Sequence, residues 1–210
     1  MATSIILAIV IGYLLGSIPC AYIAGRLKKG VDIRRVGGGN MGALNVMREI
    51  GTVTGFVVFF ADIAKGSLAV LVAQWLGLPL IAVFFAGFAS VVGHNWPVWL
   101  KFRGGQGLAT TMGVLVALAP IEFACSFAII AIVILLTSNP RLGSAMGLAF
   151  YPVFVWLFDG ELSLIFYSLA LLLFCVLKAL TRLKAELTTA SGRRSFIIDR
   201  QYKPWQRKRQ

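Results

Sequence analysis

Residues 93–110 read GHNWPVWLKFRGGQGLAT and lie between two long apolar runs. The residues in this stretch that are suited to bind an anion are His94, the only histidine of the chain, Lys101, Arg103, Gly104, Gly105 and Gly107. Glycine lets backbone N–H groups converge on an anion, because it has no Cβ and tolerates positive φ. If Gly107 opens the apolar helix that follows, the free N–H groups and the positive end of its dipole face the same place. The stretch therefore predicts an anion pocket at the mouth of a membrane helix; the alternative is a tight interfacial loop with snorkelling cations.

The composition is that of a membrane protein. Hydrophobic residues make up 59% of the chain and charged residues 13%, and the mean hydropathy is +0.85, which excludes an ordinary soluble domain. The net charge of +12 lies mostly between apolar runs and in the C-terminal tail. A basic protein built of apolar spans meets anionic lipid headgroups more naturally than nucleic acid. We therefore expect an anionic bilayer as partner and no nucleic acid.

The apolar segments predict an all-α integral membrane protein with about seven transmembrane helices, some of them short or broken around a site at the cytoplasmic face. The predicted spans cover residues 4–24, 52–76, 79–93, 108–119, 120–136, 143–158 and 162–180. Together they form a polytopic membrane domain over residues 1–181, and residues 182–210 form a basic cytoplasmic tail. The three cysteines lie far apart within apolar runs and give neither a metal spacing nor an evident disulfide. We expect no metal and no cofactor.

The apolar run of residues 108–136 decides the topology. If it is one span, the basic loop at residues 26–48 and the basic tail lie on opposite sides of the bilayer, which violates the positive-inside rule. A reversal at Pro120 gives seven crossings, with the N-terminus outside and the C-terminus in the cytoplasm. The fourth crossing, residues 108–119, then extends only about 18 Å, short of the roughly 30 Å core. Irregular backbone at that depth is tolerated around a cavity.

Two further features are expected on the cytoplasmic side. Residues 36–48 read VGGGNMGALNVMR, a second glycine loop with two amides and a cation. Asp62 and Lys65 are ionisable residues inside a span, where such residues are costly and tend to mark sites. The alternatives are a flexible glycine turn and an ion pair that only neutralises its two charges. Two glycine loops and several cations at one interface suit a substrate that carries phosphates.

The familiar soluble chemistries have no residues to support them. A single histidine without a Gly-x-Ser-x-Gly motif argues against a hydrolase triad, and neither glycine loop has the Walker A pattern. Candidates for a general base are few. The inventory favours a reaction with an already activated donor, in which N–H groups and cations supply electrostatic stabilisation.

Several motifs, taken in chain order, resemble a known family, the bacterial membrane acyltransferases that transfer an acyl chain from acyl phosphate to glycerol 3-phosphate. The matching motifs are Gly16-Ser17-Ile18-Pro19, Gly39-Asn40-Met41-Gly42-Ala43 with Asn45 and Arg48, Asp62-Ile63-Ala64-Lys65-Gly66, Gly93-His94-Asn95-Trp96-Pro97-Val98, and Gly104-Gly105 with Gly107 and Ala109-Thr110. The resemblance implies seven helices with the active site at the cytoplasmic face of the bacterial inner membrane. It also implies lysophosphatidic acid as product and no protein general base. The enzyme that produces acyl phosphate is a further partner to expect.

The resemblance also implies roles for individual residues. His94, Asn40 and Asn45 would be the catalytic group, orienting the reacting groups by hydrogen bonds. The phosphate cradle would be formed by Gly37, Gly39, Gly42, Gly104, Gly105, Gly107 and Thr110. The phosphate clamp would be formed by Arg48, Lys65, Lys101 and Arg103.

The chain departs from the family pattern at several motif positions. Where the family has Ser, Thr and Lys in its glycine loops, this chain has Gly38, Leu44 and Gln106. Where the family has Ser, His and Asn further along, it has Arg141, Val176 and Ala179. They favour a second hypothesis, a catalytically impaired membrane relative that binds lipid phosphate or a partner enzyme. A third is a small anion or lipid transporter, which the ionisable pair inside the second span allows.

Overall fold

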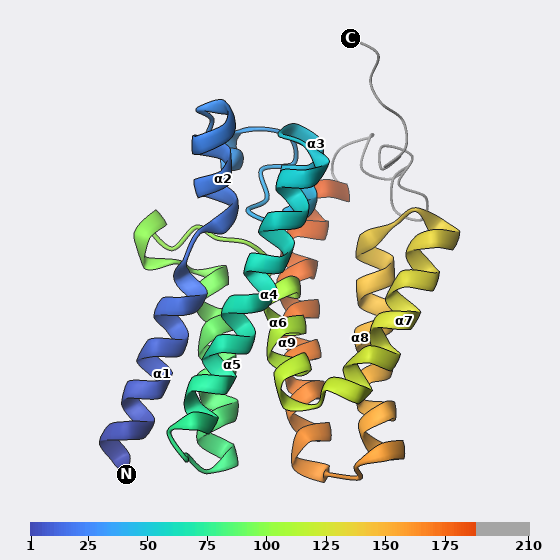
Figure 1. Cartoon of the computed structure of the whole chain (residues 1–210). Helices are drawn as coiled ribbons and strands as arrows, with labels where there is room; N and C mark the ends of the chain where they lie inside the picture. The colour runs from blue at the N-terminus through green and yellow to red at the C-terminus, as the bar shows by residue number, and fades with distance from the viewer. Residues whose placement is uncertain (188–210) are drawn as a thin grey trace. The chain divides into compact units, whose positions relative to one another are not determined.

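The computed structural model describes residues 1–187, and every regular element in that range is a helix (Figure 1). The elements are α1 (Ala2–Ser17), α2 (Cys20–Lys29), the 3₁₀ turn η1 (Ile33–Arg35), α3 (Ala43–Glu49), α4 (Thr52–Trp75), α5 (Leu80–Asn95), the 3₁₀ turn η2 (Val98–Leu100), α6 (Leu108–Leu118), α7 (Pro120–Thr137), α8 (Pro140–Phe158) and α9 (Leu162–Leu187). The predicted tail lies outside the described residues from residue 188 onward.

The helices confirm the predicted membrane class. Among the described residues, six helical segments are long and apolar enough to cross a bilayer: Ala2–Lys29, Thr52–Trp75, Leu80–Leu100, Pro120–Thr137, Pro140–Phe158 and Leu162–Thr181. The short apolar helix α6 is the remaining predicted segment. The sequence prediction missed α3, because seven residues inside a polar loop carry no apolar period long enough to read.

The first span is broken, as the Gly16–Pro19 motif predicts. Helix α1 ends at Ser17, and Ile18 has φ −58° and ψ 116°, outside the helical region. The cause is Pro19, which has no N–H to donate and which disfavours the helical conformation at the residue before it. The break leaves the Ile18 carbonyl facing the inside of the first unit, where the Lys65 Nζ donates to it at 3.0 Å.

The chain forms two compact units, residues 1–120 and residues 121 onward. In the first unit, α1 and α5 approach closely through small residues. A Cβ on Gly12 would collide with the carbonyl oxygen of Ala86, and one on Gly16 with that of Ser90. Small residues at such a spacing let two membrane helices bring their backbones together. The contact places the α1–α2 break beside the C-terminal end of α5.

Helices α4 and α6 pair in the same way within this unit. A Cβ on Gly66 would collide with the Thr110 carbonyl oxygen, and one on Gly113 with that of Ile63. The Ser67 hydroxyl also donates to the Gly113 carbonyl at 2.8 Å. Helix α6 therefore lies against the turn of α4 that carries Asp62 and Lys65. It ends at Leu118 because Ala119, at φ −146° and ψ 88°, precedes Pro120, so the predicted break at Pro120 is confirmed.

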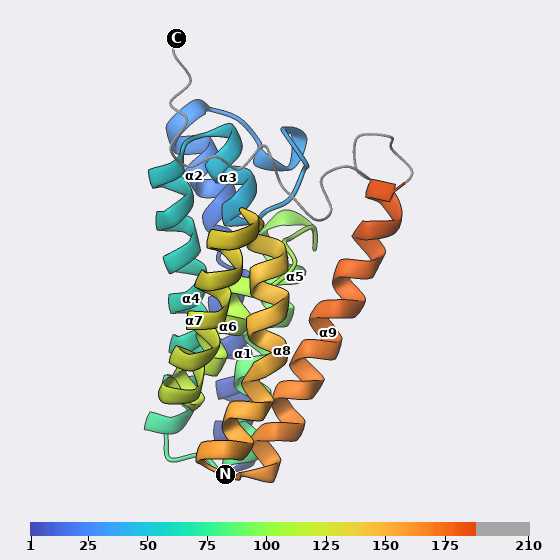
Figure 2. The same ribbon diagram turned by 90° about the vertical axis from the view of Figure 1, so that its right-hand side faces the viewer.

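The second unit holds α7, α8 and α9, with a short turn between α8 and α9 (Figure 2). A Cβ on Gly147 would meet the Ser126 carbonyl oxygen at 2.6 Å, so α7 and α8 also approach through glycine. The Asn139 side chain begins α8 by accepting hydrogen bonds from the N–H groups of Arg141 and Leu142 at 3.1 and 3.2 Å. In this unit, therefore, glycines of α8 allow its close approach to α7, and a polar side chain caps the start of α8.

Candidate active site

The first glycine loop is shaped by one side chain, Asn45 on α3. Its Nδ2 donates to the carbonyls of Ile33 and Val36, both at 3.1 Å, and its Oδ1 accepts from the Gly38 N–H at 3.1 Å. Asn45 is buried, so these three contacts satisfy its carboxamide inside the protein. They fold residues 33–38 back over the start of α3.

Gly37 and Gly39 of this loop are exposed and take backbone conformations that side chains disfavour. Gly37 and Gly39 have φ of 56° and 66°, in the left-handed region that glycine reaches without strain. Residues 37–39 are exposed and Asn40 is half-buried beside Gly42, where a Cβ would meet the Asn40 Nδ2 at 3.0 Å. Arg48, on α3, is half-buried. The loop therefore presents its main chain to the surface.

The second glycine loop folds back onto the end of α5. The N–H groups of Gly104 and Gly105 donate to the carbonyls of Asn95 and His94, at 3.2 and 3.1 Å. These carbonyls belong to the last turn of α5, which has no further helical N–H to satisfy them. Gly107, at φ 82°, is the N-cap of α6, so the sequence prediction that it opens this helix is correct.

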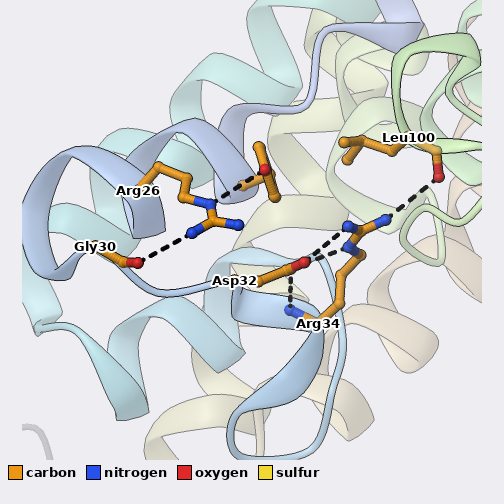
Figure 3. Close-up of polar contacts among 6 residues, drawn as sticks. Arg26, Gly30, Asp32, Arg34 and Leu100 are labelled. Atoms are coloured by element: carbon orange, nitrogen blue, oxygen red, sulfur yellow. Dashed lines mark hydrogen bonds and ion pairs between the residues drawn. The ribbon is translucent and has the colours of Figure 1, made fainter.

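The structure brings the two glycine loops into contact. A Cβ on Gly105 would collide with the His94 Nε2 and would lie 2.9 Å from the Met41 carbonyl oxygen. The Arg34 Nη1 also donates to the Leu100 carbonyl at 3.3 Å, which joins the segment before the first loop to the segment before the second (Figure 3). The main chains of residues 37–48 and 93–110 therefore share one region of the first unit.

Arg34 is itself held by Asp32, as Figure 3 shows. Its Nε and Nη2 donate to the two carboxylate oxygens at 3.0 and 2.7 Å. These hydrogen bonds lower the pKa of Asp32 to about 2. The Arg34 guanidinium also lies over the Tyr22 ring, 5.3 Å from its centroid. Sequence reasoning missed this link, because Arg34 is one of several cations in its segment and nothing local singles it out.

A buried ionic cluster lies beneath the loops. Lys65 Nζ is 2.7 Å from Asp62 Oδ1, and His94 Nδ1 is 3.6 Å from the same oxygen. The three residues are 4%, 1% and 6% exposed. Lys65 therefore contacts both Asp62, as the pair seen in the sequence suggests, and the Ile18 carbonyl.

A small hollow opens at this cluster. Its lining residues are Gly16, Ser17, Ile18, Pro19, Cys20, Met41, Asp62, Lys65, His94 and Pro97. Of the residues expected from the sequence to form the site, His94 and Lys65 line this hollow. Ser17 was not expected there, although it belongs to the Gly16–Pro19 motif that the sequence singles out. The part of the chain that the structure describes holds no group of three or more His, Cys, Asp or Glu residues that could bind a metal ion.

Two buried polar side chains lie next to the second glycine loop and α6. Asn95, 2% exposed, has neither carboxamide atom hydrogen-bonded, and the Thr110 hydroxyl, fully buried, also finds no partner within residues 1–187. A Cβ on Gly107 would sit 2.9 Å from the Asn95 Oδ1, so this carboxamide abuts the N-cap of α6. Buried polar groups without partners are rare and point to a bound molecule or strain. Asn95 was absent from the expected site, although it directly follows His94.

The predicted cations at residues 101 and 103 are exposed. Lys101 and Phe102 have φ of 54° and 57°, a conformation uncommon in residues other than glycine. The turn is held by hydrogen bonds from the Leu100 and Phe102 N–H groups to the Pro97 carbonyl, at 3.2 and 3.1 Å. A strained backbone that the surrounding structure maintains is typical of functional loops.

The protein-family model described as "Glycerol-3-phosphate acyltransferase" matches residues 6–187. The chain belongs to the glycerol-3-phosphate acyltransferase family. It is 47% identical over 150 residues to "Glycerol-3-phosphate acyltransferase 2" of Moorella thermoacetica, covering 71% of this chain and 77% of the relative. It is 37% identical over 204 residues to "Glycerol-3-phosphate acyltransferase 1" of Dehalococcoides mccartyi, covering 94% and 98%. The resemblance seen in the motifs is thereby confirmed.

Solved structures give the same family and fold. The crystal structure of PlsY (YgiH), "an integral membrane glycerol 3-phosphate acyltransferase", in its glycerol 3-phosphate form matches this acyltransferase-family chain with a TM-score of 0.80 and 33% identity, over 88% of this chain and 92% of that one. Its lysophosphatidic acid form matches with a TM-score of 0.78 and 32% identity, over the same shares of the two chains. The membrane-embedded, all-helical class expected from the sequence is confirmed.

Proposed function

We propose that this family member transfers an acyl group from acyl phosphate to the 1-hydroxyl of glycerol 3-phosphate, giving lysophosphatidic acid and phosphate for phospholipid synthesis. The observation that carries the proposal is the meeting of two glycine loops beside the start of α6, where Asn95 and Thr110 are buried without partners. A helix N-terminus flanked by glycine backbone and polar side chains favours a phosphate group.

The chemistry follows from an activated donor. The glycerol 3-phosphate hydroxyl oxygen attacks the acyl carbonyl carbon, and a new carbon–oxygen bond forms while the carbon–oxygen bond to phosphate breaks. The departing phosphate carries away the electron pair and accepts the hydroxyl proton, so the atoms balance without a protein base. What the protein must supply is orientation and electrostatic stabilisation of the anionic intermediate.

The geometry supports different roles for the candidate residues. The cradle consists of the exposed residues Gly37 and Gly39, the half-buried Gly42 and Gly104, and the buried Gly105, Gly107 and Thr110. Arg48, Lys101 and Arg103 are the cations of the clamp. His94 and Asn40 orient substrate groups. Asn45 acts indirectly by positioning the first loop, because its carboxamide is hydrogen-bonded to three backbone groups of residues 33–38.

We place the chain in the bacterial inner membrane, with the N-terminus outside and the C-terminus in the cytoplasm. The positive-inside rule supports this orientation, because the exposed cations Arg26, Lys28 and Lys29 form the last turn of α2. Such cations suit an anionic leaflet. An enzyme that produces acyl phosphate is the partner that would supply the donor at this face.

The direct test is an assay of the purified protein in detergent with acyl phosphate and glycerol 3-phosphate, following lysophosphatidate. We expect turnover, and we expect Arg48→Ala and Arg103→Ala each to reduce it about 10- to 100-fold, because a charge-assisted contact that stabilises the transition state contributes roughly 1.5–3 kcal/mol. Lys28→Ala, an exposed cation on α2, is the matched control.

Near-normal rates in both arginine variants would remove the clamp assignment. Absence of turnover in the wild-type protein, with glycerol 3-phosphate still bound, would instead favour a non-catalytic relative.

A further inference from the structure

We propose that Asp62 is a positioning residue: together with Lys65 it holds the His94 ring and the α1–α2 break, and so sets the place of the second glycine loop. The proposal rests on the function proposed above, because the loop it positions is the phosphate cradle. It assigns a role to a carboxylate that is 1% exposed within a membrane span.

Charge neutralisation alone does not explain this cluster. Burying two charges is expensive even when they attract each other, and a well-packed apolar pair of similar size is often as stable. An ion pair kept inside a span is therefore expected to do something besides stabilise it. Here the pair makes two further contacts, with Ile18 and His94, which both line the hollow.

The first contact is from Lys65 to the α1–α2 break. The ammonium donates to the Ile18 carbonyl at 3.0 Å while lying 2.7 Å from Asp62. Ile18 stands before Pro19, where the helix is interrupted, and its carbonyl also accepts from the Cys20 N–H at 3.1 Å. The Lys65 ammonium adds a contact from α4 to this carbonyl, which ties the break to α4 beside the hollow.

The second contact passes from Asp62 through His94 to the glycine loop. The His94 Nδ1 lies 3.6 Å from the Asp62 carboxylate. The opposite side of the ring, at Nε2, abuts Gly105, where a Cβ would collide with it. The Gly105 N–H donates to the His94 carbonyl at 3.1 Å. Because the imidazole packs directly against Gly105, we expect a change in the ring's orientation to displace Gly105.

Paired substitutions separate positioning from charge balance. Asp62→Leu with Lys65→Met removes both charges and the contact with His94, whereas Asp62→Asn with Lys65→Met removes the charges and leaves an oxygen acceptor. Ser67→Ala is the matched control, because it lies on α4 and loses a hydrogen bond to Gly113 of α6. Each protein is purified in detergent and checked for a single symmetric size-exclusion peak.

Two readouts report on positioning. The first is the dissociation constant for glycerol 3-phosphate, measured by calorimetry without turnover. The second is the ¹⁵N NMR signal of the imidazole in histidine-labelled protein, which is unambiguous because the chain has one histidine. A merely structural role for Asp62 would leave this signal unchanged in a folded variant.

We expect the Leu/Met variant to bind glycerol 3-phosphate at least about tenfold more weakly, since small misplacements in a site have large effects, and its imidazole signal to move. The Asn/Met variant should bind glycerol 3-phosphate about threefold more weakly, and Ser67→Ala should match wild type in both readouts. If the Leu/Met protein aggregates, a moved imidazole signal and weakened binding in Asn/Met carry the test.

A folded Leu/Met variant with wild-type affinity and an unchanged imidazole signal would overturn the proposal. If Leu/Met aggregates, wild-type affinity and an unchanged imidazole signal in the Asn/Met variant would overturn it instead. Wild-type binding without turnover would refute the proposed reaction alone. Wild-type protein that binds no glycerol 3-phosphate would refute the proposed substrate, and the imidazole signal would still decide the role of Asp62.

Discussion

The two glycine loops have similar compositions and are built in different ways. Residues 37–39 are exposed, and a single side chain, Asn45, gives the loop its shape. In the other loop Gly105 and Gly107 are buried, and the loop is held by main-chain carbonyls of α5 and by the His94 ring. The first loop therefore depends on local hydrogen bonds, whereas the second depends on how the helices of its unit pack.

The largest effect is expected from the buried loop. Gly105→Ala places a methyl group against the His94 ring and the Met41 carbonyl, and the ring, the first loop or both must move. We expect kcat/KM for glycerol 3-phosphate to fall at least about 100-fold, by the sensitivity of catalysis to misplacement. The matched substitution in the exposed loop is Gly39→Asn, because asparagine tolerates positive φ. It should lower kcat/KM by less than about fivefold. Equal losses in the two variants would mean that the loops are not held differently.

The second effect concerns the side chain that shapes the exposed loop. Asn45→Ala removes three hydrogen bonds that hold the loop, those to the Gly38 N–H and to the Ile33 and Val36 carbonyls, each worth about 0.5–1.5 kcal/mol. We expect kcat/KM to fall about tenfold, with a lower midpoint of thermal unfolding. Asn139→Ala is the control, since this residue also accepts from two N–H groups but caps α8 in the second unit. Activity that survives in Asn45→Ala as it does in Asn139→Ala would show that the first loop does not need this anchor.

The link between the loops is expected to depend on pH. Arg34 holds the pKa of Asp32 at about 2, below its ordinary 3.8. Because the folded-state pKa is the lower one, the contact stabilises the protein fully above about pH 4 and loses that effect as pH falls toward 2. The unfolding midpoint of Asp32→Asn should therefore lie below that of wild type at pH 6, with the difference shrinking as the pH falls below 4. A difference that stays constant down to pH 2.5 would contradict the assigned contact.

The smallest effect is expected at Gln106, which is half-buried between the glycines of the second loop. Gln106→Lys adds a cation to the cradle, and a charge-assisted contact to phosphate is stronger than a neutral one. We expect the KM for glycerol 3-phosphate to fall a few-fold with kcat little changed, measured by initial rates at saturating donor. An unchanged KM would place residue 106 outside the phosphate site.

The sequence predicted the spans and their interruptions well. Apolar length alone identifies the membrane helices, and Pro19 and Pro120 mark breaks because proline cannot continue a helix. The glycine loops and the Asp62/Lys65 pair were also visible, since ionisable residues inside apolar runs stand out. These signals are local and need no knowledge of which helices are neighbours.

What could not be predicted depends on distances between segments. That Lys65 contacts the Ile18 carbonyl, or that Arg34 reaches Leu100, follows from the packing of helices far apart in sequence. The role of Asn45 required the path of residues 33–38, which no periodicity specifies. Asn95 was passed over for the same reason, because only the fold buries it against the cap of α6.

The central claim is that both glycine loops bind one phosphate-bearing ligand. Amide hydrogen exchange of the purified protein, with and without saturating glycerol 3-phosphate, tests it most directly. The account predicts slower exchange in residues 37–48 and in residues 104–110 at the same ligand concentration, with no change in α8. Protection of one loop alone, or of neither while the ligand is bound, would contradict it.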